Sequence, residues 1–160
     1  MMSNKNKQYK LINAQVQALI SDESDMIANM ANISAVLFNN LEQINWAGFY
    51  LFKQEQLVLG PFQGQPACIR IPMGKGVCGT SAAIRQTFVV KDVHEFAGHI
   101  ACDVDSNSEI VIPILFNQQL IGVLDIDSPV TERFDDDDRR GLETLVSNLQ
   151  ETLISLETIQ

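Results

Sequence analysis

The stretch EIVIPILFNQQLIGVLDID, residues 109–127, carries the clearest fold signal in this 160-residue chain. It contains two apolar runs, 109–116 and 119–127, on either side of the polar pair Asn117 and Gln118. Two runs rich in Ile, Val and Leu with a short polar break between them are typical of an antiparallel β-hairpin. The second run ends in two aspartates one residue apart, so an apolar strand is expected to present two carboxyl groups on one face.

Three carboxyl groups are expected to converge on one side of this hairpin. Alternate residues of a strand share a face, so Asp125 and Asp127 should lie about 6.6 Å apart and point the same way. Pairing around residues 117 and 118 brings Asp125 opposite Glu109 or its neighbour. The alternative is that these strand ends simply reach solvent. Against it, aligned like charges are unfavourable unless a cation binds between them, and crowding raises the pKa of at least one carboxyl group. Strict alternation gives the second run two faces, one with Leu120, Leu124 and Ile126 and the other with Ile121, Val123, Asp125 and Asp127.

Further strands and flanking helices are predicted outward from the hairpin. Strands are expected at 45–52, 56–62, 68–73 and 87–92. Helices are expected at 9–20, 26–41, 79–85 and about 135–157. The helical spacing is clearest where Leu142, Leu145 and Val146 recur. Residues 135–138, all aspartate, are expected to form a capped, solvated helix start, with a metal-binding acidic run as the alternative. The layout is one α+β domain over residues 1–160, with N-terminal helices at about 9–42, a sheet core at about 45–128 and a C-terminal helix.

Composition excludes several classes of partner. The net charge is −9, from 20 acidic and 11 basic residues, so nucleic acids and anionic membranes are disfavoured. No apolar run approaches the roughly 18 residues that span a bilayer, and the N-terminus lacks the apolar core of a signal peptide. Cys68, Cys78 and Cys102 are too few, and odd in number, for a secreted disulfide framework. A cytoplasmic location is therefore expected, where a cysteine pair is more often reactive than structural.

Residues 93–108 form a long polar segment of the kind that often serves as a functional lid. Cys102 lies in it among Asp103, Asp105 and Glu109, and nearby carboxylates raise a thiol pKa rather than lower it. Either this cysteine is inert or the carboxyl groups are there for a substrate. A carboxyl-rich pocket suits an ammonium group, and a protonated Glu109 can hydrogen-bond an acceptor oxygen. Cys102 can then attack an electrophilic centre before a second cysteine closes a disulfide.

The stretch GKGVCG, residues 74–79, matches the dinucleotide-binding pattern G-x-G-x-x-G, and Asp92 lies downstream. The helix expected after it is too short for the crossover of a parallel βαβ unit. The glycines are better interpreted as a tight turn that places Cys78 near a helix N-terminus, where a thiol pKa is lowered.

Metal and histidine chemistry find little support in the residue spacing. A site formed by Cys68, Cys78, His99 and Cys102 does not match the common zinc patterns, so no metal is expected. His94 and His99 are interpreted as loop residues, and no spacing supports papain-like Cys/His catalysis.

The segments INWAGFYL, LGPFQGQPACIRIPMGKGVCGTSA, VVKDVHEFAGHIACDVDSNSEIVIPI and LIGVLDIDSP resemble those of the free methionine-(R)-sulfoxide reductases, which are built on a GAF domain. The resemblance runs from about residue 44 to 141 and includes all three cysteines in the family's spacing. It implies a six-stranded antiparallel sheet with helices packed on one face and a loop-covered ligand cavity on the other. It also implies reduction of free L-methionine-(R)-sulfoxide, thioredoxin as reductant, a homodimer, and no cofactor.

The resemblance further implies roles for the three cysteines. Cys102 occupies the position that attacks the sulfoxide sulfur and becomes a sulfenic acid, with Cys78 as the competing nucleophile. Cys78 or Cys68 then forms the disulfide that thioredoxin reduces.

The remaining site residues are also implied by the resemblance. Glu109, Asp125 and Asp127 match carboxyl groups that bind the substrate, and Glu109 polarises the sulfoxide oxygen. Trp46 and Tyr50 match aromatic residues that contact the methyl–sulfur end.

Two other functions remain open. A GAF sensing module would bind a small molecule without turnover, but it is normally fused to an output domain and needs no set of three cysteines. A thiol sensor that reads oxidants directly would form its disulfide with peroxide and show no preference for one sulfoxide epimer.

Overall fold

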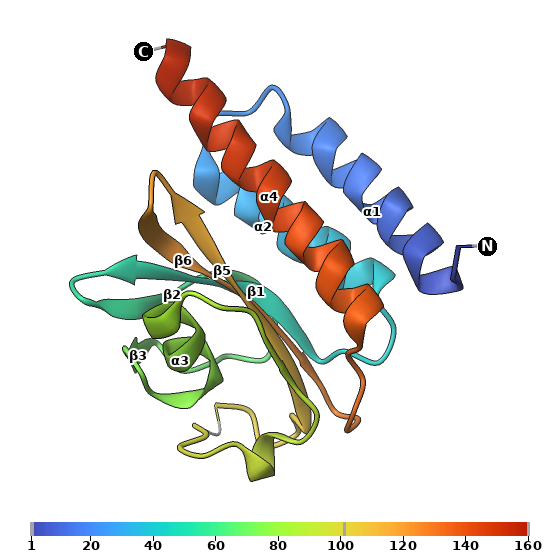
Figure 1. The fold of residues 1–160 in the computed structure, drawn as a ribbon, viewed down its shortest axis with the longest axis vertical. Helices are drawn as coiled ribbons and strands as arrows, with labels where there is room; N and C mark the ends of the chain where they lie inside the picture. The colour runs from blue at the N-terminus through green and yellow to red at the C-terminus, as the bar shows by residue number, and fades with distance from the viewer. Residues whose placement is uncertain (1, 101, 160) are drawn as a thin grey trace.

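The computed structural model describes residues 2–100 and 102–159, with side chains as far as residue 153. The helices are α1 (Asn4–Ile20), α2 (Met26–Asn40), α3 (Gly76–Ile84), the short 3₁₀ helix η1 (Val93–Glu95) and α4 (Asp136–Ile159). The strands are β1 (Trp46–Lys53), β2 (Gln56–Gly64), β3 (Arg70–Pro72), β4 (Phe88–Val90), β5 (Ser108–Phe116) and β6 (Gln119–Ser128). All strand pairs are antiparallel, in the order β3-β2-β1-β6-β5-β4 (Figure 1).

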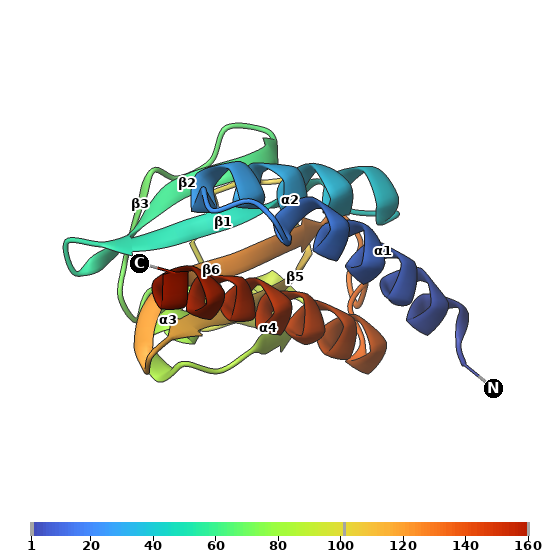
Figure 2. The same ribbon diagram turned by 90° about the horizontal axis from the view of Figure 1, so that it is seen from above.

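The sheet separates two layers with different roles. Helices α1, α2 and α4 cover one face, whereas α3 and the segment 93–108 lie on the other (Figures 1 and 2). Strand β1 alternates between them: Phe49 packs into the core beneath the helices, and Trp46 and Tyr50 pack into a second apolar cluster on the opposite face. The expected α+β architecture, helices on one face and a cavity on the other, is confirmed.

Several element boundaries differ from the expected ones. Helix α1 begins at Asn4, five residues early, because the Ser3 hydroxyl accepts a hydrogen bond from the Asn6 N–H and caps it. Helix α3 begins at Gly76 instead of residue 79. The predicted strands all form, each within two residues of its expected ends. Among the described residues, no helix combines the length and apolar character needed to cross a membrane.

The β5–β6 hairpin forms around Asn117 and Gln118 as predicted, and both have positive φ angles, 48° and 63°. This geometry is typical of the two-residue turns whose twist matches that of the strands. A β-bulge follows directly: Leu115 pairs with Leu120, but Ile114 pairs with Gly122. Ile121 is therefore an extra residue, and it shifts the register of everything beyond it by one position.

The bulge corrects two expectations about this hairpin. Leu120 packs on the cavity side and Ile121 against the helix-side core, the reverse of strict alternation. Glu109 pairs directly with Asp127, and Asp125 pairs with Val111 instead of with Glu109 or its neighbour. Since paired residues point to the same face, the bulge is what places all three carboxyl groups on the cavity side.

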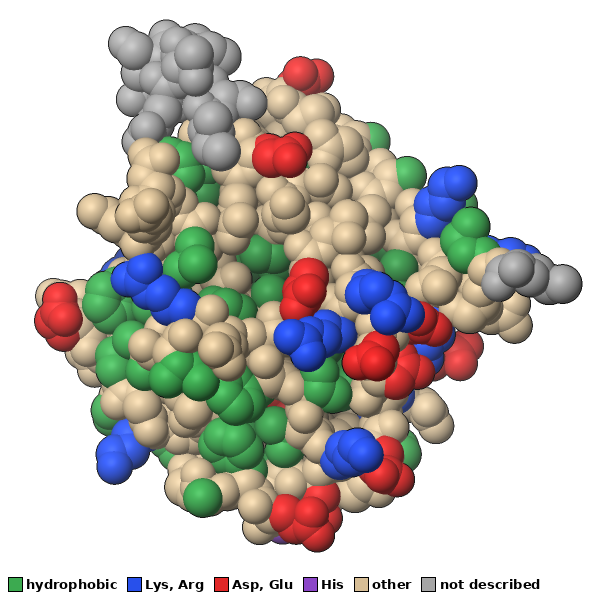
Figure 3. Space-filling view, in the orientation of Figure 1, with side chains coloured by type: hydrophobic (Ala, Val, Ile, Leu, Met, Phe, Trp, Pro, Cys, Tyr) green, Lys and Arg blue, Asp and Glu red, His purple; other side chains and the backbone are tan. Residues whose placement is uncertain are grey.

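The acidic start of α4 joins the N-terminal helix to the rest of the fold. Asp138 is fully buried and not solvated as expected: it pairs with Lys5 at 2.6 Å and Arg133 at 3.2 Å, and it accepts a hydrogen bond from the Tyr9 hydroxyl at 2.7 Å. Asp135 accepts hydrogen bonds from the backbone N–H groups of residues 137 and 138 and caps the helix. Charged side chains of both signs gather over this helix start in Figure 3, whereas hydrophobic ones gather over α3.

Candidate active site

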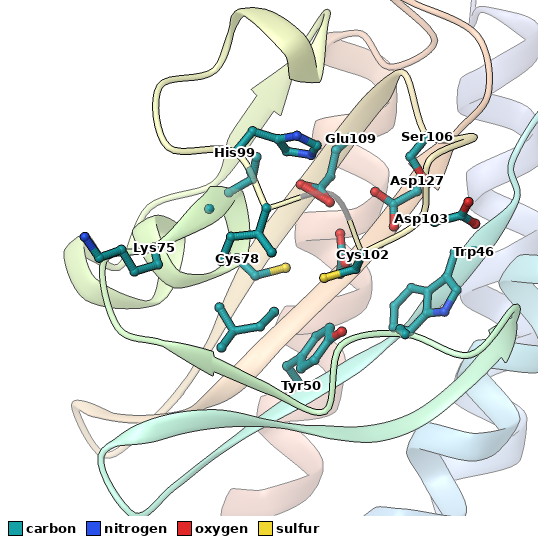
Figure 4. A pocket seen from close by; sticks show the side chains of 16 residues that line it. Trp46, Tyr50, Lys75, Cys78, His99, Cys102, Asp103, Ser106, Glu109 and Asp127 are labelled. Atoms are coloured by element: carbon teal, nitrogen blue, oxygen red, sulfur yellow. The ribbon is translucent and has the colours of Figure 1, made fainter.

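A pocket lies between the sheet, α3 and the described residues of the segment 93–108. Seven of the eight predicted site residues line it: Trp46, Tyr50, Cys78, Cys102, Glu109, Asp125 and Asp127. Figure 4 shows labelled members of this set pointing toward a common space from β1, β5, β6, α3 and the 93–108 segment. The eighth residue, Cys68, lies in the β2–β3 connection and is bonded to Cys102.

Three carboxyl groups form the floor of the pocket, and each is more than nine-tenths buried: Glu109, Asp125 and Asp127. Burial raises the pKa of Glu109 well above its usual range, and the two nearby aspartates raise it further. Burial also raises the pKa of Asp125, followed by the charge of Asp127, while hydrogen bonds from Glu109 and Cys78 act in the opposite direction. Glu109 is therefore the carboxyl group that stays protonated and neutral, and it donates hydrogen bonds to the two aspartates.

One carboxylate oxygen of Asp125 is buried and unsatisfied by the described residues. Its Oδ1 atom is buried and accepts no hydrogen bond from any residue that the structure describes. A buried carboxylate oxygen without a donor costs free energy, on the order of 1–3 kcal/mol or more for a charged group. An ammonium group in the pocket would supply both the donors and the compensating charge.

As the pH rises, the free energy of unfolding of the wild type is expected to fall more than that of an Asp127→Asn variant. Burial raises the pKa of Asp127 from the ordinary 3.8 to about 6. Between these values the folded state binds more protons than the unfolded state, so the free energy of unfolding falls as the pH rises through this window. The difference reaches on the order of 3 kcal/mol above it. Urea denaturation at pH about 4 and about 7 measures this effect. Asp105→Asn, at an exposed position, is the control. An equal pH dependence of stability in the Asp127→Asn variant and the wild type would contradict the prediction.

Cys78 lies in the first turn of α3, where the sequence places it, and keeps a free buried thiol. The expected lowering of its pKa by the helix N-terminus is wrong. Burial raises the pKa of this thiol well above its usual range, and the charges of Asp125 and Glu109 raise it further. The ligand atoms of Cys78, Glu109 and Asp125 lie within 4.8 Å of one another, so this trio, and not the set with His99, could hold a metal ion.

The disulfide resolves which cysteines pair. Cys68 and Cys102 are joined at 2.00 Å between their sulfur atoms, with their Cα atoms 5.3 Å apart. The Tyr50 hydroxyl donates to the Cys68 carbonyl oxygen at 2.9 Å, and the Trp46 indole N–H donates to the Gln65 carbonyl oxygen at 3.1 Å. The two aromatic residues therefore hold the segment that presents Cys68, besides lining the pocket.

The segment that carries Cys102 is held from the same strand. Asn45, directly before β1, donates from its amide to the Asp103 carboxylate at 3.0 Å and to the Ser106 hydroxyl at 3.2 Å. Sequence reasoning missed Asn45 and Ser106. A polar residue at the start of a buried strand was the available signal for Asn45, but nothing in the spacing links it to a segment some sixty residues away.

The two histidines differ in their surroundings. His94 is exposed, and its ring pairs with Asp92 at 2.9 Å. His99 lines the pocket, which its interpretation as a loop residue did not include, and burial lowers its pKa. A neutral imidazole at the pocket rim adds a polar group without adding charge.

The chain is similar to proteins of known fold and activity. Residues 28–153 match the GAF domain family. The chain is 52% identical to the free methionine-R-sulfoxide reductase of Escherichia coli, with 96% of this chain and 93% of that protein covered. It is also similar to an fRMsr of Staphylococcus aureus in complex with substrate (56% identity, TM-score 0.87, 91% and 95% covered). A free methionine-R-sulfoxide reductase of Neisseria meningitidis in complex with its substrate is 40% identical (TM-score 0.93, 100% and 96% covered).

Proposed function

The chain belongs to the free methionine-R-sulfoxide reductases of the GAF domain family, and we propose that Cys102 is the cysteine that attacks the sulfoxide. The protein reduces free L-methionine-(R)-sulfoxide to L-methionine. One observation supports the proposed role most directly: Cys102, cross-linked to Cys68, lines the same pocket as the three buried carboxyl groups.

The substrate's charges fit this pocket in one orientation. Its ammonium group binds between Asp125 and Asp127, where Asp125 Oδ1 has no donor among the described residues. Its sulfoxide oxygen accepts a hydrogen bond from Glu109, which burial keeps neutral. The methyl–sulfur end contacts Trp46 and Tyr50, whose rings stack with centroids 5.9 Å apart.

The chemistry then needs only two thiols and an acid. Cys102 attacks the sulfoxide sulfur, and Glu109 gives its proton to the departing oxygen, which makes an otherwise poor leaving group acceptable. The oxygen transfers to Cys102 as a sulfenic acid, and methionine is released as a thioether. The Cys68 thiolate attacks the Cys102 sulfur, the disulfide forms and the oxygen leaves as water. One sulfoxide and two thiols give one thioether, one disulfide and one water.

Cys78 has a different role in this scheme. Its thiol is held protonated by burial and neighbouring carboxyl groups, so it is a poor nucleophile, and the observed disulfide does not include it. Its hydrogen bond to Asp125 instead favours the ionised form of that carboxyl group, which the substrate ammonium requires.

Partners and location belong to the same proposal. Thioredoxin reduces the Cys68–Cys102 disulfide after each turnover, and a reducing cytoplasm is the setting in which such a cycle runs. The protein acts as a homodimer, and the exposed Leu11 and Leu19 on α1 support an interface on that helix. No nucleic acid or membrane takes part, given the net charge of −9.

The function is tested by its substrate profile. With dithiothreitol as reductant, the protein is expected to release methionine from free L-methionine-(R)-sulfoxide. The S epimer is the stereochemical control, and an N-acetylated R substrate, which lacks the ammonium group, is the control for the aspartates. Equal turnover of both epimers would overturn the proposal, and an absence of any turnover would favour a ligand-sensing GAF module.

A further inference from the structure

Exposed hydrophobic side chains lie close in sequence to both cysteines of the Cys68–Cys102 disulfide. Ile69, which follows Cys68, is 67% exposed, and Val104, two residues after Cys102, is 85% exposed. Ile100, two residues before Cys102, is 36% exposed. Scattered apolar side chains on a surface need no explanation, but a group of them beside a reactive bond marks a site of interaction.

The requirement for a partner here rests on the proposed function. Each turnover leaves the disulfide closed, so two electrons must come from outside before Cys102 can attack again. A thiolate must reach one of the two sulfur atoms. Cys102 lines the substrate pocket, which the sheet, α3 and Ile100 enclose, whereas Cys68 is not among the residues that line it. Cys68 is therefore the sulfur that a protein thiolate can approach.

We propose that Ile69, Ile100 and Val104 form a docking surface for a protein dithiol reductant, whose first thiolate attacks Cys68. The partner's reactive thiol lies in an apolar face of its own, because only such a face gains by covering these three side chains. The choice of a protein over a small thiol follows from the same side chains: a small thiol buries little of their surface, whereas a docked protein buries most of it.

The exchange balances in two steps. The partner's thiolate forms a bond to the Cys68 sulfur while the Cys68–Cys102 bond breaks, and Cys102 leaves as a thiolate into the pocket. The partner's second thiol then attacks the mixed disulfide and frees Cys68. The partner loses two electrons and two protons and becomes a disulfide, and the chain gains them as two thiols.

The β2–β3 connection is suited to receive this attack. Tyr50 and Trp46 hold it through hydrogen bonds to the carbonyl oxygens of Cys68 and Gln65. Little ordering is then needed when the partner docks, which favours fast association.

The test uses the oxidised chain and no methionine sulfoxide. Reduced thioredoxin is the probe, and loss of the disulfide is followed by alkylation and mass analysis after an acid quench. In an Ile69→Ser, Val104→Ser variant the second-order rate constant with thioredoxin is expected to fall about tenfold or more, since two apolar side chains that the partner would cover are lost. With dithiothreitol the rate is expected to stay within about twofold of the wild type. Ile27→Ser, on α2 and 51% exposed, is the matched control.

Each outcome decides the proposal separately from the function. An unchanged rate with thioredoxin in the double variant overturns the docking surface, even if methionine release proceeds normally. Failure of the wild type to reduce any sulfoxide overturns the function but leaves this rate measurement intact. A thioredoxin whose second cysteine is replaced by serine traps the mixed disulfide: a bond to Cys68 supports the proposal, and a bond to Cys102 overturns the assignment of the attacked sulfur.

Discussion

Replacing Cys102 by serine is expected to lower kcat for free L-methionine-(R)-sulfoxide by at least about 10³-fold, the scale seen when a catalytic nucleophile is removed. The serine hydroxyl does not ionise near neutral pH, and it cannot accept the sulfoxide oxygen, because serine forms no equivalent of a sulfenic acid. Methionine release with dithiothreitol measures the effect.

Cys78→Ser is the matched control for this substitution, because it removes a sulfur from the same pocket. Its turnover with dithiothreitol is expected to stay within about tenfold of the wild type, since serine can still donate a hydrogen bond to Asp125. If Cys78→Ser is the inactive variant and Cys102→Ser retains turnover, the assignment of the attacking cysteine is wrong.

A Glu109→Gln variant is expected to lose about 10²–10³ in kcat, the usual contribution of a positioned general acid. Glutamine keeps the size and a hydrogen-bond donor but has no proton to give to the departing oxygen. KM should change far less than kcat, because the ammonium site on Asp125 and Asp127 is retained.

The pH profile separates acid catalysis from simple positioning at Glu109. Burial raises the pKa of Glu109, so wild-type kcat should decline as the pH rises through that value and the carboxyl group loses its proton. The variant should lack this alkaline decline. The exposed Glu95→Gln is the control, and an identical alkaline limb in wild type and Glu109→Gln would show that another group supplies the proton.

The sequence predicts the hairpin but not its register. Asn117 and Gln118 tolerate positive φ between two apolar runs, and this local signal is enough to locate the turn. The bulge at Ile121 has no comparable local signal, because Leu120, Ile121, Val123 and Leu124 are all apolar and both faces of the strand are buried. A single extra residue therefore reverses the faces of half a strand, and only packing against both layers selects it.

Pairing of the three cysteines also lay beyond sequence reasoning. Cys68 and Cys78 are both far from Cys102 along the chain, and either was compatible with the disulfide. What selects Cys68 is three-dimensional: Tyr50 and Trp46 of β1 hold one segment, and Asn45, directly before β1, holds the other. Burial of Cys78 among carboxyl groups raises its thiol pKa and outweighs the lowering expected at a helix N-terminus. Only the helix N-terminus can be inferred from the sequence.

The disulfide spans 34 residues and encloses β3, α3 and β4, so each turnover closes and reopens a covalent ring that contains Cys78. Closing a ring of this size removes conformational freedom from the unfolded chain, and the chain-entropy estimate is on the order of 4 kcal/mol. The oxidised protein is thus more stable toward unfolding than the reduced protein, which is the form that is ready for substrate. When reductant runs short, the arrested molecules accumulate in the form that best resists heat and proteolysis, and the restoration of reductant recovers them without new synthesis.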